Sequence, residues 1–98
     1  MINFEISKLR MIYRGALRNP RSAAEYVELP ESVTDFHGDI WIYADRIVFV
    51  TFIGKIISVI IESRILADTA RSLFDAVWVF SPNKRKGSDI LREMGRLK

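Results

Sequence analysis

One strongly apolar stretch, residues 39–62, limits what this chain can fold into. It is rich in β-branched and aromatic residues, and two dipeptides punctuate it, Ala44-Asp45 and Gly54-Lys55. Turn residues between apolar runs are typical of antiparallel hairpins. The stretch therefore predicts three short strands, over residues 40–43, 47–52 and 56–61.

The middle strand of this set, residues 47–52, is apolar on both faces. Phe49 points to one face and Phe52 to the other. We therefore expect a central strand that is covered on both sides. Ser58 and Glu62 make one face of the third strand more polar.

Length and composition indicate a single small domain. The chain has 98 residues, enough for one core, and 49% of them are hydrophobic, which is typical of a globular protein. It has no cysteine, which excludes disulfides, thiolate metal sites and a cysteine nucleophile. Residues 47–61 are too few for a transmembrane helix, and Gly54-Lys55 divides them. Residues 1–15 lack the apolar core of a signal peptide, so we expect a cytoplasmic protein.

Outside the apolar stretch, the pattern predicts one more strand and two helices. Residues 9–13 are expected to form a strand, and residues 21–29 a short helix. Ser63 is a good N-cap for a longer helix over residues 64–80. The apolar residues of that helix follow helical spacing, at Leu66, Ala70, Leu73, Phe74 and Val77.

Together these elements predict an α+β domain over residues 1–80. It would have an antiparallel or mixed β-sheet of four to five strands, with one long helix packed on one face. Residues 81–98 are expected to form a basic C-terminal tail with a short helix, beside a body that is complete without it. Lys84, Arg85 and Lys86 are candidates for contact with nucleic acid. We favour the alternative of a solvated terminus, since no aromatic residue interleaves with these charges.

Three runs of sequence resemble a known family. They are D-I-W-I-Y-A-D-R-I-V-F-V from residue 39, I-S-V-I-I-E-S from residue 57, and I-L-A-D-T-A-R-S-L-F-D-A-V-W from residue 65. The pattern is similar to the C-terminal part of the phospholipase D-like effector domain of TrmB-like transcriptional regulators of archaea and bacteria. In that family a strand ends in Ile-Trp-Ile-Tyr-Gly-Asp-Lys, two more strands end in Val-Ile-Ile-Glu, and the closing helix ends in Phe-x-x-x-Trp. Upstream, L-R-M-I-Y-R-G from residue 9 and R-N-P-R-S-A-A-E-Y from residue 18 resemble the segment that precedes these strands in the family. The match therefore covers residues 9–78, and Ala44 stands where the family usually has Gly.

The resemblance implies a non-catalytic effector-binding or dimerisation domain without a cofactor. Sugar effectors are expected for this family, and aromatic faces stack on sugar rings. Trp41 and Tyr43 are therefore candidate ligand-binding residues, together with Glu62 at the end of the last strand. Such regulators also carry a DNA-binding winged helix and a fuller effector domain. We expect the chain to be either a fragment of a longer regulator or a stand-alone second half of an effector domain.

The same resemblance raises the alternative of a degenerate phospholipase D-like phosphodiesterase or nuclease. Active members use a His-x-Lys-x(4)-Asp motif, in which His attacks phosphorus and Lys holds the phosphoryl oxygens. If Asp45 takes the Asp place, Gly38 and Ile40 take the other two, and neither can do that chemistry. His37 is one residue off, and such a shift points a strand side chain to the opposite face. We therefore expect no catalytic residue and no metal site.

A homodimer is expected, because one long helix and a short alanine-rich helix leave part of the apolar sheet uncovered. A lone half of a phospholipase D-like domain would also be expected to replace the missing half with a second copy. The candidates for the dimer interface, or for the core beside it, are Trp41, Phe49, Phe52 and Trp78. For Trp41, the alternative is packing against Trp78 or Phe80 in the core.

Overall fold

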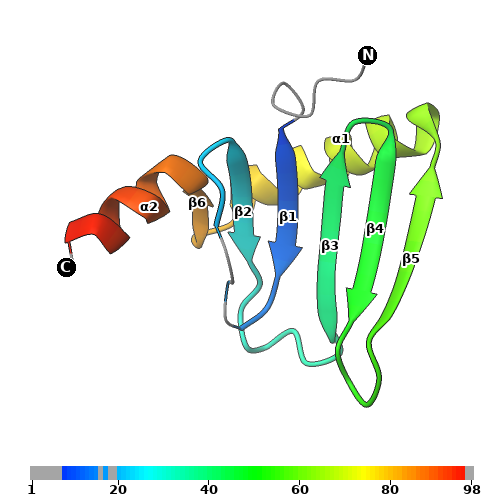
Figure 1. Ribbon diagram of the computed structural model, residues 1–98, viewed down its shortest axis with the longest axis horizontal. Coiled ribbons are helices and arrows are strands. Elements are labelled where there is room, and N and C mark those ends of the chain that lie inside the picture. Colours follow the sequence, from blue (N-terminus) through cyan, green and yellow to red (C-terminus); the bar gives the residue numbers. More distant parts are fainter. Residues whose placement is uncertain (1–7, 16, 18–19, 97–98) are drawn as a thin grey trace.

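The residues that the structure describes form one mixed β-sheet with two helices (Figure 1). The computed structural model describes residues 8–15, 17 and 20–96, so the first seven residues of the N-terminal stretch expected to lack a signal peptide lie outside the described residues. The elements are, in order, β1 (Leu9–Tyr13), β2 (Ala24–Glu28), β3 (Gly38–Tyr43), β4 (Arg46–Thr51), β5 (Ile57–Glu62), α1 (Arg64–Phe80), β6 (Lys84–Lys86) and α2 (Gly87–Arg96). The four strands and the long helix expected from the sequence are confirmed, with small shifts at the strand ends.

The sheet has the strand order β5-β4-β3-β1-β2-β6. Strands β1 and β2 are parallel, and all other neighbours are antiparallel. The α+β class, the mixed sheet and the single long helix on one face are thus confirmed. The sheet has six strands rather than four to five, because β2 and β6 join it.

The short helix expected over residues 21–29 is wrong, because these residues contain β2. Strand β2 pairs in parallel with β1. Alternation along the strand sends Ala24 and Tyr26 to one face and Val27 to the other, and all three are buried. A short helix here would bury one side only, whereas the strand buries both, so tertiary packing overrides the local pattern.

The long helix α1 covers one face of the sheet. Ser63 caps it as expected, since its hydroxyl oxygen accepts a hydrogen bond from the backbone N–H of Leu66 at 3.2 Å. Phe74 is fully buried, in a cluster with Val27 of β2 and Ile42 of β3. Burying a side chain of this size stabilises the fold by about 2 to 3 kcal/mol. This contact holds α1 across the centre of the sheet.

The opposite face has its own core, to which the C-terminal segment contributes. Ile90 of α2 belongs to a buried cluster with Met11, Tyr13, Ala24 and Tyr26. The rings of Tyr13 and Tyr26 meet edge to face, with centroids 6.4 Å apart. Strand β6 meanwhile pairs with β2. The segment expected to be a tail therefore supplies a strand and a buried side chain, and the short helix expected within it is α2.

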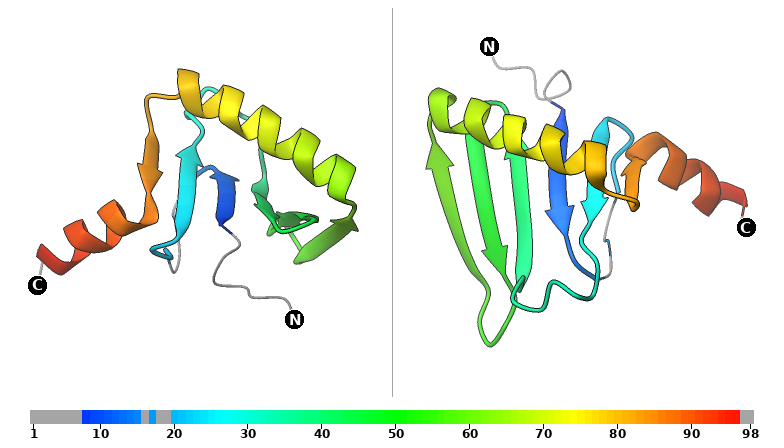
Figure 2. Two further views of the ribbon diagram at one scale, coloured as in Figure 1. Left: turned by 90° about the horizontal axis from the view of Figure 1, so that it is seen from above. Right: turned by 180° about the vertical axis from the view of Figure 1, so that it is seen from behind.

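Coverage of the sheet is uneven. Helix α1 crosses the strands near the end where β3 turns into β4, and the other halves of β3, β4 and β5 extend beyond it (Figure 2). Ile47 and Val48 of β4 are buried, but Phe49 and Phe52 are exposed. The expectation that this strand is covered on both sides therefore holds for its first half only. Among the described residues, no helix combines the length and the apolar character needed to cross a bilayer.

Candidate functional site

A row of polar side chains crosses three strands on the face away from α1. The register sets Tyr43 of β3 beside Arg46 of β4, and Arg46 beside Glu62 of β5. Arg46 Nε lies 3.7 Å from Glu62 Oε2. A hydrogen bond with Tyr43 and the negative charge of Glu62 raise the pKa of Arg46 above its ordinary value. The row thus places a permanent cation between a phenol and a carboxylate.

Two of the three candidate ligand residues, Tyr43 and Glu62, belong to this row. The third, Trp41, lies on the same face of β3, where it packs against the cluster around Met11. Its indole N–H is buried and has no hydrogen-bond partner among the described residues. Arg46, which connects the other two side chains, is not among the residues expected from the sequence. The two-residue turn between β3 and β4 fixes the register of these strands and sets Arg46 opposite Tyr43. This turn, which is visible in the sequence, is the signal that points to Arg46.

Trp41 and Trp78 lie on opposite faces of the sheet, so the alternative in which they pack together is wrong. Trp78 belongs to the cluster under α1, where its ring centroid is 5.9 Å from that of Phe74. Phe80, the other suggested partner, is 85% exposed at the end of α1. Both tryptophans are instead partly buried within the chain, each in a different core cluster.

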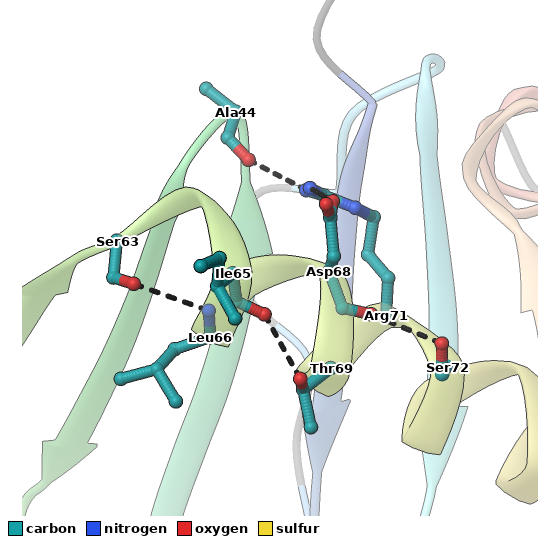
Figure 3. A network of polar contacts seen from close by, with 8 residues as sticks. All are labelled: Ala44, Ser63, Ile65, Leu66, Asp68, Thr69, Arg71 and Ser72. Atoms are coloured by element: carbon teal, nitrogen blue, oxygen red, sulfur yellow. Dashed lines mark hydrogen bonds and ion pairs between the residues drawn. The ribbon is translucent and has the colours of Figure 1, made fainter.

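The polar flank of α1 is tied to the turn between β3 and β4 (Figure 3). The Arg71 guanidinium donates to the Ala44 carbonyl oxygen at 2.6 Å and to Asp68 Oδ1 at 2.5 Å. Ala44 has a φ of +49°, in the left-handed region that favours glycine. Arg71 therefore holds a turn whose backbone is strained for alanine.

A polar hollow of about 360 Å³ lies beside this contact. Its lining consists of Lys8, Arg10, Ala44, Asp45, Arg64, Asp68 and Arg71. Arg71 is paired with Asp68, and Arg10 Nε lies 3.2 Å from Glu25 Oε1. The lining has four cations and two carboxylates, and the ion pairs of Arg71 and Arg10 reduce the positive charge that it offers to an anion. We interpret it as part of the scaffold that fastens α1 to the sheet.

A second hollow, of about 260 Å³, lies on the half of the sheet that α1 leaves uncovered. Residues 35–37 before β3, the first residues of β3 and side chains of β4 and β5 line it, and exposed His37 is among them. Gly38 and Ile40, at the places of the phospholipase D-like His and Lys, also line it. A Cβ at Gly38 would lie 1.7 Å from the Val50 carbonyl oxygen. No side chain fits at this position unless the backbone moves.

Lys84, Arg85 and Lys86, the candidate nucleic-acid residues, form β6 at one edge of the sheet. Two of them have partners within the chain. The Arg85 guanidinium pairs with the Glu93 carboxylate of α2, and Lys84 Nζ lies 5.8 Å from the centroid of a Trp78 ring. These contacts reduce the positive charge that β6 can offer to a phosphate backbone.

The apolar residues with the greatest exposure in the sheet gather on β5 and on the chain that flanks it. We call this surface the apolar edge, and its members are Phe52, Ile53, Ile56, Ile57, Val59, Ile60 and Ile65. Strand β5 is an edge strand, because β4 is its only neighbour in the described sheet. Exposed Phe49, from the interface candidates, lies beside it on β4. Val59 lies on the face toward α1 and Ile60 on the opposite face, so apolar side chains are exposed on both sides of this edge. Large exposed apolar surfaces mark sites of protein–protein interaction.

Comparison of the chain with protein-family models, with curated proteins and with solved structures finds no match. The resemblance to TrmB-like regulators therefore stays a hypothesis that rests on the sequence runs quoted above. The candidate site is defined by the geometry of this chain alone. It consists of the polar row across β3, β4 and β5 and of the apolar edge beside it.

Proposed function

We propose that this chain is a non-catalytic assembly and effector-binding domain that works as a homodimer. One observation carries the proposal: nothing in the described part of the chain covers the apolar edge at β5. An edge strand with apolar side chains and open backbone groups is a template for pairing with another chain. Removing such a surface from water is the main driving force of association.

The sequence resemblance supports this proposal. In the resembled family, glycine usually stands at the position of Ala44, and Ala44 has a φ of +49°, a conformation that glycine adopts most readily. Phospholipase D-like domains pair two similar halves across a pseudo-twofold axis, and a twofold pair of this chain would have the same arrangement. The proposed setting is the effector part of a cytoplasmic TrmB-like regulator.

An effector site on the polar row is the second part of the proposal. Trp41 and Tyr43 offer aromatic surfaces, while Arg46 and Glu62 offer a donor and an acceptor for hydroxyl groups. Few polar groups beside apolar surface are typical of ligand sites, and a sugar has both an apolar ring face and polar rims. A sugar that binds only the folded chain should raise Tm as its concentration increases. If no sugar shifts Tm, the effector part of the proposal fails and the dimer stands.

The alternative of a degenerate phospholipase D-like phosphodiesterase has less support. Gly38 stands at the expected His position, where a Cβ would lie 1.7 Å from a backbone oxygen. His37 is exposed in the loop before β3. Hydrolysis of a generic phosphodiester by the chain, lost in His37→Ala, would overturn the non-catalytic proposal.

Sedimentation equilibrium of the 11.3 kDa chain tests dimerisation. We expect a concentration-dependent dimer, which Ile60→Lys weakens at least about tenfold, or ~1.4 kcal/mol, because it puts like charges at the contact. Val79→Lys is the matched control, since Val79 is 65% exposed and Ile60 is 62% exposed, but Val79 lies near the far end of α1. A clean monomer at every concentration, or equal weakening by both variants, would contradict the proposal.

A further inference from the structure

The open edge of β5 has an alternating pattern of backbone groups. The Ser63 N–H donates to the Asp45 carbonyl oxygen at 2.8 Å, and this pair continues the β4–β5 register. Along an antiparallel ladder, alternate residues of a strand bond to the same neighbour. The odd-numbered residues of β5 therefore bond toward β4. The N–H and C=O groups of Ser58, Ile60 and Glu62 point toward the open edge.

We propose that two copies of the chain join β5 to β5 in antiparallel order, with a twofold axis at Ile60. This inference rests on the proposed dimer and specifies its contact. Facing residues of antiparallel strands share a face of the sheet. In this register Ile60 faces the partner's Ile60, and Val59 faces the partner's Ile61. The open backbone groups then bond to one another, and one sheet runs through both copies.

Charge and hydrogen bonding favour this register over its neighbours. Glu62 is the only charged residue of β5. An axis at Glu62 would set two carboxylates opposite each other, which is destabilising. An axis at Val59 would set Glu62 against the apolar side chain of the partner's Ile56, and an axis at Ile61 would set it against that of the partner's Ile60. The axis at Ile60 instead gives each Glu62 carboxylate a hydroxyl donor, from the partner's Ser58.

The other edge of the sheet explains why the assembly stops at two copies. Strand β6 has three residues, all of them basic, and α2 follows it directly. Short length and charged side chains protect a sheet edge from pairing. Each chain therefore has one open edge and one closed edge. Pairing at β5 uses the open edge of both copies and closes the assembly.

Cysteine cross-linking tests the register, because the chain has no cysteine of its own. Val59→Cys and Ile61→Cys are mixed in equal amounts and oxidised mildly. Facing residues come within disulfide reach, so the mixture should form linked dimers at least about tenfold faster than either variant alone. Two copies of Ile60→Cys should also cross-link, because Ile60 faces the partner's Ile60. This disulfide would lie on the face of the sheet opposite to that of Val59 and Ile61. Val79→Cys gives the background of random collisions.

Amide hydrogen exchange checks the same contact without any substitution. The N–H groups of Ile60 and Glu62 should exchange at least about tenfold more slowly at concentrations where the chain dimerises. The N–H of Val59 already bonds to β4, and it gives the internal control.

The outcomes separate the inference from the proposed function. A dimer in which Val59→Cys cross-links with itself, or in which no β5 variant cross-links, overturns the register and leaves the dimer standing. A dimer whose Ile60 amide exchanges as in the monomer overturns strand pairing. A chain that stays monomeric overturns both, and leaves β5 to a strand of another protein.

Discussion

The two edges of this sheet are built in opposite ways. Strand β5 has six residues, only the last of them charged, and most of its apolar side chains are about half exposed or more. Strand β6 has three basic residues, and the helix that follows it packs against β2 and β6. Shortness, charge and cover are the features that keep a sheet edge from pairing. This chain has all three at one edge and a single terminal glutamate at the other.

The two core clusters divide the molecule in the same way. The buried strand residues of one cluster come from β1 and β2, those of the other come from β2 and β3, and neither cluster includes a described residue of β5. Strand β5 is held by its ladder to β4 and by its connection to α1. The half of the sheet with the least internal packing is thus the half with the open edge. It is also the half that gains most from a second copy.

Removal of residues 82–98 should have the largest effect, because it takes away the closed edge. It deletes β6 and α2, bares one side of β2, and removes Ile90 from the core beside Tyr26. We expect the truncated chain not to fold, since domains of this kind are stable by only about 5 to 15 kcal/mol. Circular dichroism and thermal unfolding check this. If the truncated chain has a native spectrum and unfolds cooperatively, residues 82–98 are a dispensable tail, as the sequence suggests. They would then not be needed to close the β6 edge, which contradicts the comparison of the two edges.

Gly87→Ala should loosen the same edge without removing it. A Cβ at Gly87 would lie 1.6 Å from the Arg21 carbonyl oxygen, a backbone atom that cannot rotate away. We expect a loss on the order of 3 kcal/mol in the free energy of unfolding, measured by denaturant titration. Gly95→Ala is the matched control, because nothing lies within 4 Å of a Cβ there. In α2 that change should stabilise by up to about 1 kcal/mol. Similar results for both variants would mean that the β6–α2 junction is not packed against residue 21.

The parts of the fold that could be predicted have local signals. The Ser63 cap and the apolar spacing after it predict α1, and turn dipeptides between apolar runs predict the hairpins. Strands β2 and β6 have no such signal. Ala24 and Val27 fit a helical spacing, and Lys84–Lys86 has no apolar pattern. Both segments are strands because of the neighbours they meet, β1 and β2, and a single sequence does not show those pairings.

In the candidate site, too, single residues could be predicted from the sequence, whereas the contacts that depend on strand pairing could not. Tyr43 and Glu62 could be named from the sequence, but their connection through Arg46 depends on the register of three strands. The sequence predicts that part of the apolar sheet is uncovered. It does not predict where, because that depends on which strand lies at the edge of the sheet. Trp41 and Trp78 were paired in one interpretation because the sequence does not say which face a helix covers.

Replacing the lysines of β6 should have the smallest effect on stability and a specific effect on assembly. In the double variant Lys84→Gln with Lys86→Gln, the free energy of unfolding should fall by less than about 1 kcal/mol, because the main loss is the contact of Lys84 with the Trp78 ring. The β6 edge also loses charge that hinders pairing. Sedimentation velocity at high protein concentration should then show species larger than the dimer, where the unchanged chain stays dimeric.

Lys8→Gln with Arg14→Gln is the matched control, since it removes two positive charges that lie outside both β6 and the apolar edge. Equal growth of both double variants would mean that lower net charge explains the association. If neither double variant forms species larger than the dimer, the short length of β6 and the cover by α2 are enough to close this edge. The charge of the lysines would then not contribute to the difference between the two edges. Growth of the β6 variant alone, halted at two copies when Ile60→Lys is added, would show that each chain then pairs at both edges. Chains with two open edges extend without closure, whereas those with one open edge stop at the dimer.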